Sequence, residues 1–210
     1  MKVNTKTKVK ASDINEKIAF SLERISQIFR ILLWEKAKKF KLSPIQIQFL
    51  LYLNNHKAYF CTVSNLAEEF GLTRATVSDA IKALVKKKLL LKRASPKDGR
   101  IFILKLSPEG KKIADELENW ISPVKKQLEK FPEELKNTIL LFLMEFIASF
   151  QNRVINTARM CIVCRYFKKN AHPGSKKPHH CLLTDKPLAL SDLKLDCENN
   201  EPKIKNKSNK

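Results

Sequence analysis

One stretch of the chain, residues 42–106, constrains the fold most, because signals for helix and turn follow one another there in a fixed order. It opens with Ser43, which can cap a helix that has proline at its first position and Gln46 placed to bond back to the cap. A short helix that ends at Gly71 follows, and Thr73 can cap a second, basic helix. The stretch therefore predicts two short helices joined by a glycine turn.

The second half of this stretch predicts a β-hairpin. Two short β-rich runs, 89–93 and 101–106, flank a turn sequence with Asp98-Gly99 at its tip. Helix, glycine turn, capped basic helix and hairpin, in that order, form a winged helix-turn-helix, which lays one helix in a DNA groove and the hairpin beside it. We therefore predict a mostly α fold with a small β-hairpin wing, and double-stranded DNA as the partner.

The charge of the chain agrees with that partner. Lys and Arg total 41 against 21 Asp and Glu, a net charge of +20, which attracts nucleic acid first and an anionic membrane surface second. The N-terminus shows no signal peptide, and the longest apolar run, 139–150, is too short to cross a bilayer and contains Glu145. We expect a cytoplasmic protein.

Composition and periodicity divide the chain into four parts. Residues 1–12 are polar and lysine-rich, which predicts a disordered basic arm, and helical periodicity extends over 13–157, with 42–106 as the DNA-reading core. Residues 158–198 form a cysteine-rich segment, predicted to bind metal, and 199–210 a disordered tail.

Long helices are predicted on both sides of the reading core. The first spans about 13–40, with Asp13 and Glu16 as a capping box, and two more span about 107–130 and 132–157. The apolar stripes of the terminal helices exceed what one small winged module needs to cover, which predicts a homodimer. The alternative is that they complete a monomer core.

The basic helix that follows Thr73 has two distinct sides. Its inward side is predicted to comprise Val77, Ala80, Ile81, Leu84 and Val85. On the other side, Arg74 can reach guanine and Asp79 can accept from a cytosine amine, while Arg100 at the wing tip can enter a minor groove. The predicted DNA-binding residues are Thr73, Arg74, Ala75, Thr76, Ser78, Asp79, Lys82, Lys97 and Arg100. The alternative is a solvated lysine face on an ordinary helical domain.

Several motifs in this region resemble those of the MarR-type transcriptional regulators. They are Leu42-Ser43-Pro44, Val63-Ser64-Asn65-Leu66-Ala67, Leu72-Thr73-Arg74-Ala75-Thr76-Val77-Ser78, Asp98-Gly99-Arg100 and Leu106-Ser107-Pro108-Glu109-Gly110. Over 13–157 the resemblance implies a winged-helix homodimer whose first and last helices form the interface. It also implies a pseudo-palindromic operator and usually repression. Carried over, Thr73, Arg74, Thr76 and Ser78 are groove or phosphate contacts and Arg100 is the wing contact. Asp79 and the cysteine-rich C-terminus depart from the family pattern.

The C-terminal cysteines have the spacing of a metal site. Cys161 and Cys164 form a C-x2-C pair that places two thiolates on one tight turn, and Cys181 and Cys197 follow. A zinc ion bound by these four, with His180 as a substitute ligand, is the first interpretation. The same cysteines could hold an iron–sulfur cluster, Cys161 and Cys164 could form a reversible disulfide, or all could stay unliganded.

These features predict a sequence-specific transcription regulator, with metal, redox state or a small molecule as its effector. The chain shows no Ser-His-Asp arrangement, no paired catalytic acids and no phosphate loop, so we expect it not to be an enzyme. The alternative function is non-specific or architectural DNA binding with a structural zinc site. Cys61 is expected to be a small buried residue, and Trp34 and Trp120 to be packing anchors or part of a ligand pocket.

Overall fold

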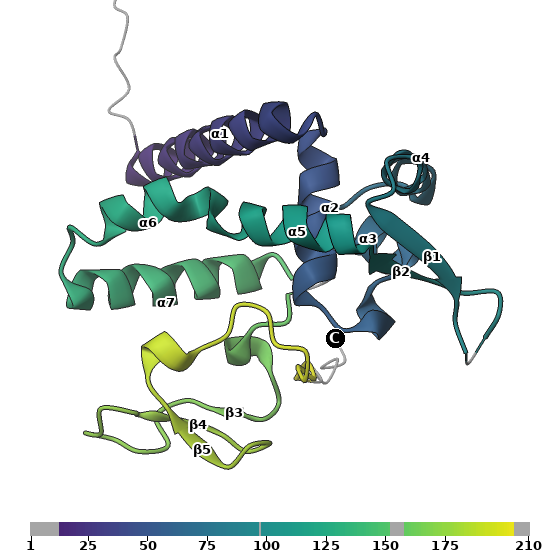
Figure 1. Cartoon of the computed structure of the whole chain (residues 1–210). Coiled ribbons are helices and arrows are strands. Elements are labelled where there is room, and N and C mark those ends of the chain that lie inside the picture. Colours follow the sequence, from purple (N-terminus) through teal and green to yellow (C-terminus); the bar gives the residue numbers. More distant parts are fainter. Residues whose placement is uncertain (1–12, 97, 152–157, 204–210) are drawn as a thin grey trace, which may run out of the picture.

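The computed structural model describes residues 13–96, 98–151 and 158–203, so the predicted basic arm 1–12 and Lys97 lie outside the described residues. Figure 1 shows a helical body, a hairpin at one end, and a small C-terminal module beneath the helices. The helices are α1 (Ile14–Phe40), α2 (Pro44–Asn55), α3 (Val63–Glu69), α4 (Arg74–Lys86), α5 (Pro108–Leu117), α6 (Ser122–Leu128) and α7 (Glu133–Ser149). The strands are β1 (Leu90–Ala94), β2 (Phe102–Leu106), β3 (Phe167–Lys168), β4 (His179–Cys181) and β5 (Lys186–Leu188).

Local capping explains where most of the helices begin. The Ser43 hydroxyl accepts from the Gln46 amide at 3.3 Å and the Gln46 side chain accepts from the Ser43 amide at 3.0 Å, so the predicted capping box of α2 is confirmed. For α1, the prediction of a capping box between Asp13 and Glu16 is wrong. Asp13 accepts instead from the backbone amide of Asn15, because the carboxylate folds back over the nearest free N–H group.

The winged helix-turn-helix is confirmed, and it has its own core. Helices α2, α3 and α4 pack around fully buried side chains such as Phe49, Leu66 and Leu84, and β1 pairs antiparallel with β2. One inward prediction was wrong: Val85 is 39% exposed, because the last turn of α4 extends beyond the core that covers Val77 and Ile81. The prediction of a mostly α fold with a β-hairpin wing holds.

The helix predicted over 107–130 is broken in the structure. Helix α5 ends at Leu117, a 3-10 turn follows, and α6 begins at Ser122. The break lies at Asn119, whose φ of −90° and ψ of 15° are not helical, and Pro123 shortly after it has no N–H to continue the backbone bonding. The final helix, predicted to reach about 157, ends at Ser149, and 152–157 lie outside the described residues.

The C-terminal segment folds into a compact module against α7. Strands β3, β4 and β5 form an antiparallel sheet, and Met160, Phe167 and Leu193 make a small core with Met144 of α7. The prediction that residues 199–203 belong to a disordered tail is wrong. The Arg165 amide donates to the Glu201 carbonyl at 2.8 Å and a bridge joins this segment to Cys164, so residues 199–203 belong to the module. Residues 204–210 lie outside the described part.

Candidate DNA-reading face and cysteine cluster

Helix α4 presents the side chains that the sequence predicts for DNA contact. Val77 and Ile81 point into the core, which leaves Arg74, Ala75 and Thr76 exposed in the first turn. Ser78 is half-buried, while Asp79 and Lys82 are exposed one turn further on. The N-terminus of α4, with its free backbone N–H groups, therefore opens onto a face rich in hydroxyl and cationic groups, which suits a phosphate.

Some of these side chains already have partners within the helix. The Thr73 hydroxyl caps the helix by accepting from the Thr76 amide at 3.1 Å, and the two threonine hydroxyls lie 2.8 Å apart. Asp79 pairs with Lys82 at 3.0 Å. Both partners of this ion pair are largely exposed, so it contributes only about 0.5 kcal/mol and can exchange for a base or a phosphate.

The wing extends the basic face. The Arg100 backbone amide donates to the Asp98 carboxylate at 2.9 Å, which closes the turn at the hairpin tip and leaves the Arg100 side chain exposed. On the strands, the Lys92 ammonium lies 4.3 Å from the centre of the Phe102 ring. A groove of about 1000 Å³ separates the hairpin from α3, and Ser64 contributes to its wall. Lys97 lies outside the described residues, so its predicted contact stays a prediction.

The start of α5 is bound to the residues just before β1 through a buried set of hydrogen bonds centred on Ser107. The sequence predicted only that a helix begins there. The Ser107 hydroxyl donates to the Lys88 carbonyl at 2.7 Å and accepts from the Gly110 amide at 3.0 Å, while the Ser107 amide donates to the Leu89 carbonyl at 3.0 Å. Gly110 packs so closely here that a Cβ atom would lie 2.0 Å from the Leu89 carbonyl oxygen. These contacts therefore fix the position of α5 relative to the end of α4 and the start of β1.

The four C-terminal cysteines lie around one small cavity. Cys161, Cys164, Cys181 and Cys197 line a space of about 30 Å³. All of them are free thiols, and the Cys161 sulfur accepts from the Lys194 amide at 3.2 Å. With the side chains in these positions, no group of three or more His, Cys, Asp or Glu in the described ranges converges closely enough to hold a metal ion.

The surroundings of the four thiols differ. Burial raises the pKa of Cys161, and the three neighbouring cysteines add to that rise against the bond from Lys194. Burial would also raise the pKa of Cys181, but hydrogen bonds from Thr184 and the Leu183 amide outweigh it and lower the value. The side chain of His180, the predicted substitute ligand, does not line the cavity.

The ring of His180 has other neighbours. Its Nδ1 lies 3.0 Å from the His172 ring, and its Nε2 lies 3.1 Å from the Asp185 carboxylate. On strand β4 it precedes Cys181, and successive side chains of a strand point to opposite faces. The three side chains His172, His180 and Asp185 therefore form a polar group separate from the cysteine cavity.

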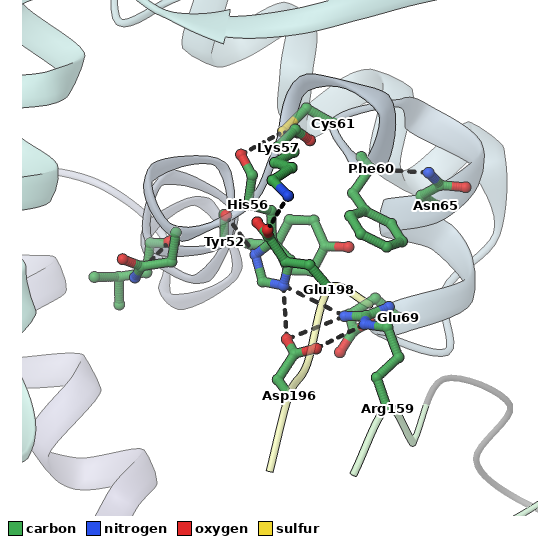
Figure 2. A network of polar contacts seen from close by, with 12 residues as sticks. Tyr52, His56, Lys57, Phe60, Cys61, Asn65, Glu69, Arg159, Asp196 and Glu198 are labelled. Carbon is green, nitrogen blue, oxygen red and sulfur yellow. Dashed lines mark hydrogen bonds and ion pairs between the residues drawn. The ribbon is translucent and has the colours of Figure 1, made fainter. Parts of the chain in front are cut away.

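A second set of residues, which the sequence analysis missed, joins the C-terminal module to the winged helix. Figure 2 shows Arg159 and Asp196 reaching the end of α2 and the end of α3. Asp196 lies 2.6 Å from His56 Nε2 and accepts from Arg159 at 2.6 and 3.1 Å, and Arg159 also donates to Glu69 at 3.1 Å. We call these four residues, with Lys57 and Glu198, which pair at 2.7 Å, the interdomain clamp.

The clamp is partly shielded from water. The side chains of His56 and Arg159 are only 10% and 14% exposed, and Arg159 lies over the Phe60 ring at 4.7 Å. Burial alone would raise the pKa of Asp196, yet the bonds from His56 and Arg159 hold it well below its ordinary value. No local signal in the sequence pointed from His56 to a partner 140 positions away.

Comparison with known proteins places this reading face in a family. Residues 40–101 match a family model described as MarR family. The HTH-type transcriptional regulator BilQ of Clostridioides difficile is 22% identical over 128 residues, which are 58% of this chain and 85% of the relative.

Solved structures share the fold. MepR of Staphylococcus aureus in its complex with DNA has a TM-score of 0.56 at 22% identity, and covers 64% of this chain and 98% of its own. BpsR of Bordetella bronchiseptica, whose DNA binding is regulated by 6-hydroxynicotinic acid, has a TM-score of 0.51 at 20% identity, over 65% and 96% of the two chains.

Fold and reading face together define a winged helix-turn-helix protein. Within that class, residues 40–101 match the MarR-family model, which confirms the resemblance predicted from the sequence motifs. BilQ and MepR are described as transcription regulators. In the described part of the chain, no helix is both long and apolar enough to span a membrane. The cysteine-rich module lies beyond the matched residues.

Proposed function

We propose that this protein is a sequence-specific transcription regulator that binds a pseudo-palindromic operator as a homodimer and represses transcription in the cytoplasm. The observation that carries the proposal is the exposed face of α4, where the side chains of Arg74 and Thr76 reach solvent beside a capped helix N-terminus and a basic wing. The net charge of +20 supports the same partner, since it favours binding to a polyanion.

Dimerisation is supported by apolar surface on the two terminal helices. On α1 the exposed large apolar residues are Ile14, Ile18, Phe20, Ile25, Ile28, Ile31 and Trp34. On α7 they are Leu135, Ile139, Phe142 and Phe146, and Phe150 follows directly after the helix. The rings of Phe142 and Phe146 stack at 5.7 Å, with Phe150 following at 5.2 Å from Phe146. Apolar surface of this extent marks an interaction site. A second copy is the fitting occupant, because a two-fold operator needs two reading heads one helical turn apart.

The operator is tested by selection from a random duplex DNA library with the full-length protein. Enrichment of an inverted repeat supports the proposal. Tight, salt-sensitive binding without any enriched sequence would instead indicate the architectural function.

Two variants then assign the role of α4. Arg74→Ala should relax preference at one base position of each half-site, whereas Lys86→Ala, an exposed lysine in the last turn of α4, should weaken binding equally on all sequences. Equal loss on selected and random DNA from Arg74→Ala would remove its base-reading role.

The dimer is tested by light scattering during size-exclusion chromatography. Phe146→Asp should convert a dimer to a monomer, because a carboxylate buried in an apolar interface has no partner. The matched control is Leu182→Asp, an apolar residue that is 51% exposed on the C-terminal module. A monomeric wild-type protein, or a Phe146→Asp protein that stays dimeric, would contradict the assignment of α7 to the interface.

Regulation by an effector completes the proposal. The DNA affinity should respond to a metal, to the redox state of the four C-terminal cysteines or to a small molecule. A reporter gene behind the selected operator distinguishes repression from activation, since deletion of the regulator should raise expression. A fall in expression on deletion would contradict repression and leave the operator itself unaffected.

A further inference from the structure

The C-terminal module has too little core to account for its compact fold. Its strands have only two or three residues each, and its core consists of six buried residues, one of them Met144 from α7. Segments of this size usually need disulfides, a metal or a partner to fold. The cysteines of the module are free, so disulfides do not supply the missing constraint.

The four C-terminal cysteines are placed to supply it. They come from three separate parts of the module: Cys161 and Cys164 from the turn after residue 160, Cys181 from the end of β4, and Cys197 from the final segment. All four border the same small cavity. A single ligand of four sulfurs would therefore connect the start, middle and end of the module.

We propose that Cys161, Cys164, Cys181 and Cys197 bind one zinc ion as a tetrathiolate site, and that this site holds the interdomain clamp against the helix-turn-helix. Sulfur is a soft ligand that selects zinc over the hard cations, and four thiolates complete its tetrahedral shell. No coordination position stays open, so the site is structural or regulatory and not catalytic. The four side chains line one cavity but do not yet converge closely enough to hold an ion, so they must turn toward it as the ion enters.

Binding must release protons, because thiolates and not thiols are the ligands. Each of the four thiols gives up one proton to solvent as the Zn²⁺ ion enters, so a complex with a local charge of −2 replaces four neutral groups. Backbone amides are in place to stabilise that charge: Lys194 N–H points at Cys161, and Leu183 and Thr184 N–H at Cys181.

The connection to the winged helix runs through the residues on either side of Cys197. Asp196, directly before it, binds His56 and Arg159, and Glu198, directly after it, pairs with Lys57. The Cys197 amide donates to the Arg159 carbonyl at 2.8 Å, which ties the two strands of the clamp together. A metal that fixes the position of Cys197 therefore fixes both carboxylates that contact the segment between α2 and α3. The zinc site and its link to the clamp stand independently of the proposed function, whereas any resulting change in DNA affinity rests on it.

The metal is tested on full-length protein purified without oxygen. Elemental analysis should give one zinc per chain, and Co²⁺ in its place should give the visible spectrum of tetrahedral cobalt thiolate. Cys197→Ser should lose the metal. Cys61→Ser is the matched control and should retain it, because Cys61 is buried in the winged helix, away from the cavity. Iron with acid-labile sulfide, a Cys161–Cys164 disulfide, or no metal after incubation with Zn²⁺ would each overturn the zinc site.

The clamp is tested by hydrogen exchange over residues 56–70, which include the α2–α3 connection and α3. Asp196→Asn should keep zinc and raise exchange there by about tenfold or more, since it weakens charge-assisted hydrogen bonds to two side chains. Asp192→Asn is the matched control, because Asp192 pairs with Lys177 inside the module.

Loss of zinc through Cys197→Ser should raise exchange over the same residues as Asp196→Asn does. If Cys197→Ser loses zinc and exchange over 56–70 stays as in the wild type, the coupling is overturned while the metal site stands. Neither measurement uses DNA, so failure of the zinc site or of the clamp is distinguishable from failure of the proposed operator binding.

Discussion

Replacement of Gly110 by alanine tests how closely α5 packs against the backbone of Leu89, directly before the wing. An added Cβ would lie 2.0 Å from the Leu89 carbonyl oxygen and 2.9 Å from its carbonyl carbon, where contacts under 3.0 Å are essentially never found. The Leu89 oxygen cannot simply withdraw, because it accepts the bond from the Ser107 amide. The backbone of α5 must therefore move away from the hairpin by about 1 Å.

Two opposing effects determine how much the free energy of unfolding changes in Gly110→Ala. Alanine stabilises a helix by up to about 1 kcal/mol relative to glycine. Forcing an extra carbon into a closely packed seat costs about 1–3 kcal/mol, and the contact at Gly110 is with backbone and not with a flexible side chain. Overpacking therefore wins, and we expect the free energy of unfolding to fall by about 2 kcal/mol.

The assay is urea unfolding followed by circular dichroism, with wild type and variant at the same protomer concentration. Gly99→Ala is the control, because nothing lies within 4 Å of a Cβ at Gly99 and its stability should change by less than about 0.5 kcal/mol. DNA affinity should fall with Gly110→Ala, because the positions of α4 and the wing relative to each other are no longer fixed by α5. A Gly110→Ala protein as stable as the wild type would refute the close contact between Gly110 and the Leu89 backbone.

Three further changes probe other parts of the structure. Ser43→Ala removes the hydroxyl that caps α2 and should lower the free energy of unfolding by about 1 kcal/mol in the same urea assay. Met144→Ala leaves a cavity between α7 and the C-terminal module and should cost about 2–4 kcal/mol, read as faster limited proteolysis of residues 158–203 with the winged helix intact. Burial raises the pKa of Cys61 to about 11, so at pH 9 iodoacetamide should modify it far more slowly in the native protein than in urea, as measured by peptide mass spectrometry; equal rates would contradict its burial.

The parts of this fold that sequence reasoning could predict are those encoded by neighbouring residues. The capping box of Ser43 and Gln46 acts over three positions, and the inward side of α4, apart from Val85 in its last turn, follows from helical periodicity. The kink near Pro123 had a local signal too, but apolar periodicity on both sides of it favoured one continuous helix.

The clamp had no such signal. His56 and Asp196 are ordinary polar residues 140 positions apart, and only the folding of the C-terminal module brings them within 2.6 Å. The four cysteines are an intermediate case. Their spacing predicted a common site, and the structure places them around one cavity, but spacing alone could not distinguish zinc from iron–sulfur or a disulfide.

The position of the clamp predicts how the module should act on DNA binding. It contacts the α2–α3 connection and the end of α3 through His56 and Glu69, and it leaves Arg74 on α4 and Arg100 on the wing exposed. Loss of zinc should therefore free the helix-turn-helix to move without uncovering or covering the basic side chains that face phosphate. DNA affinity should fall because a mobile helix-turn-helix loses conformational freedom when it binds. The number of counterions released from the DNA should stay the same.

Salt titration separates these two quantities. A plot of the logarithm of the DNA-binding constant against the logarithm of salt concentration should have the same slope for the zinc-loaded wild type and for Cys197→Ser, with the two lines offset in affinity. If the module instead acted by masking basic residues, its release would let more of them reach the DNA, and the slope for Cys197→Ser would steepen by about one unit for each additional phosphate neutralised. Parallel lines support control through the position of the helix-turn-helix, and diverging lines would contradict it.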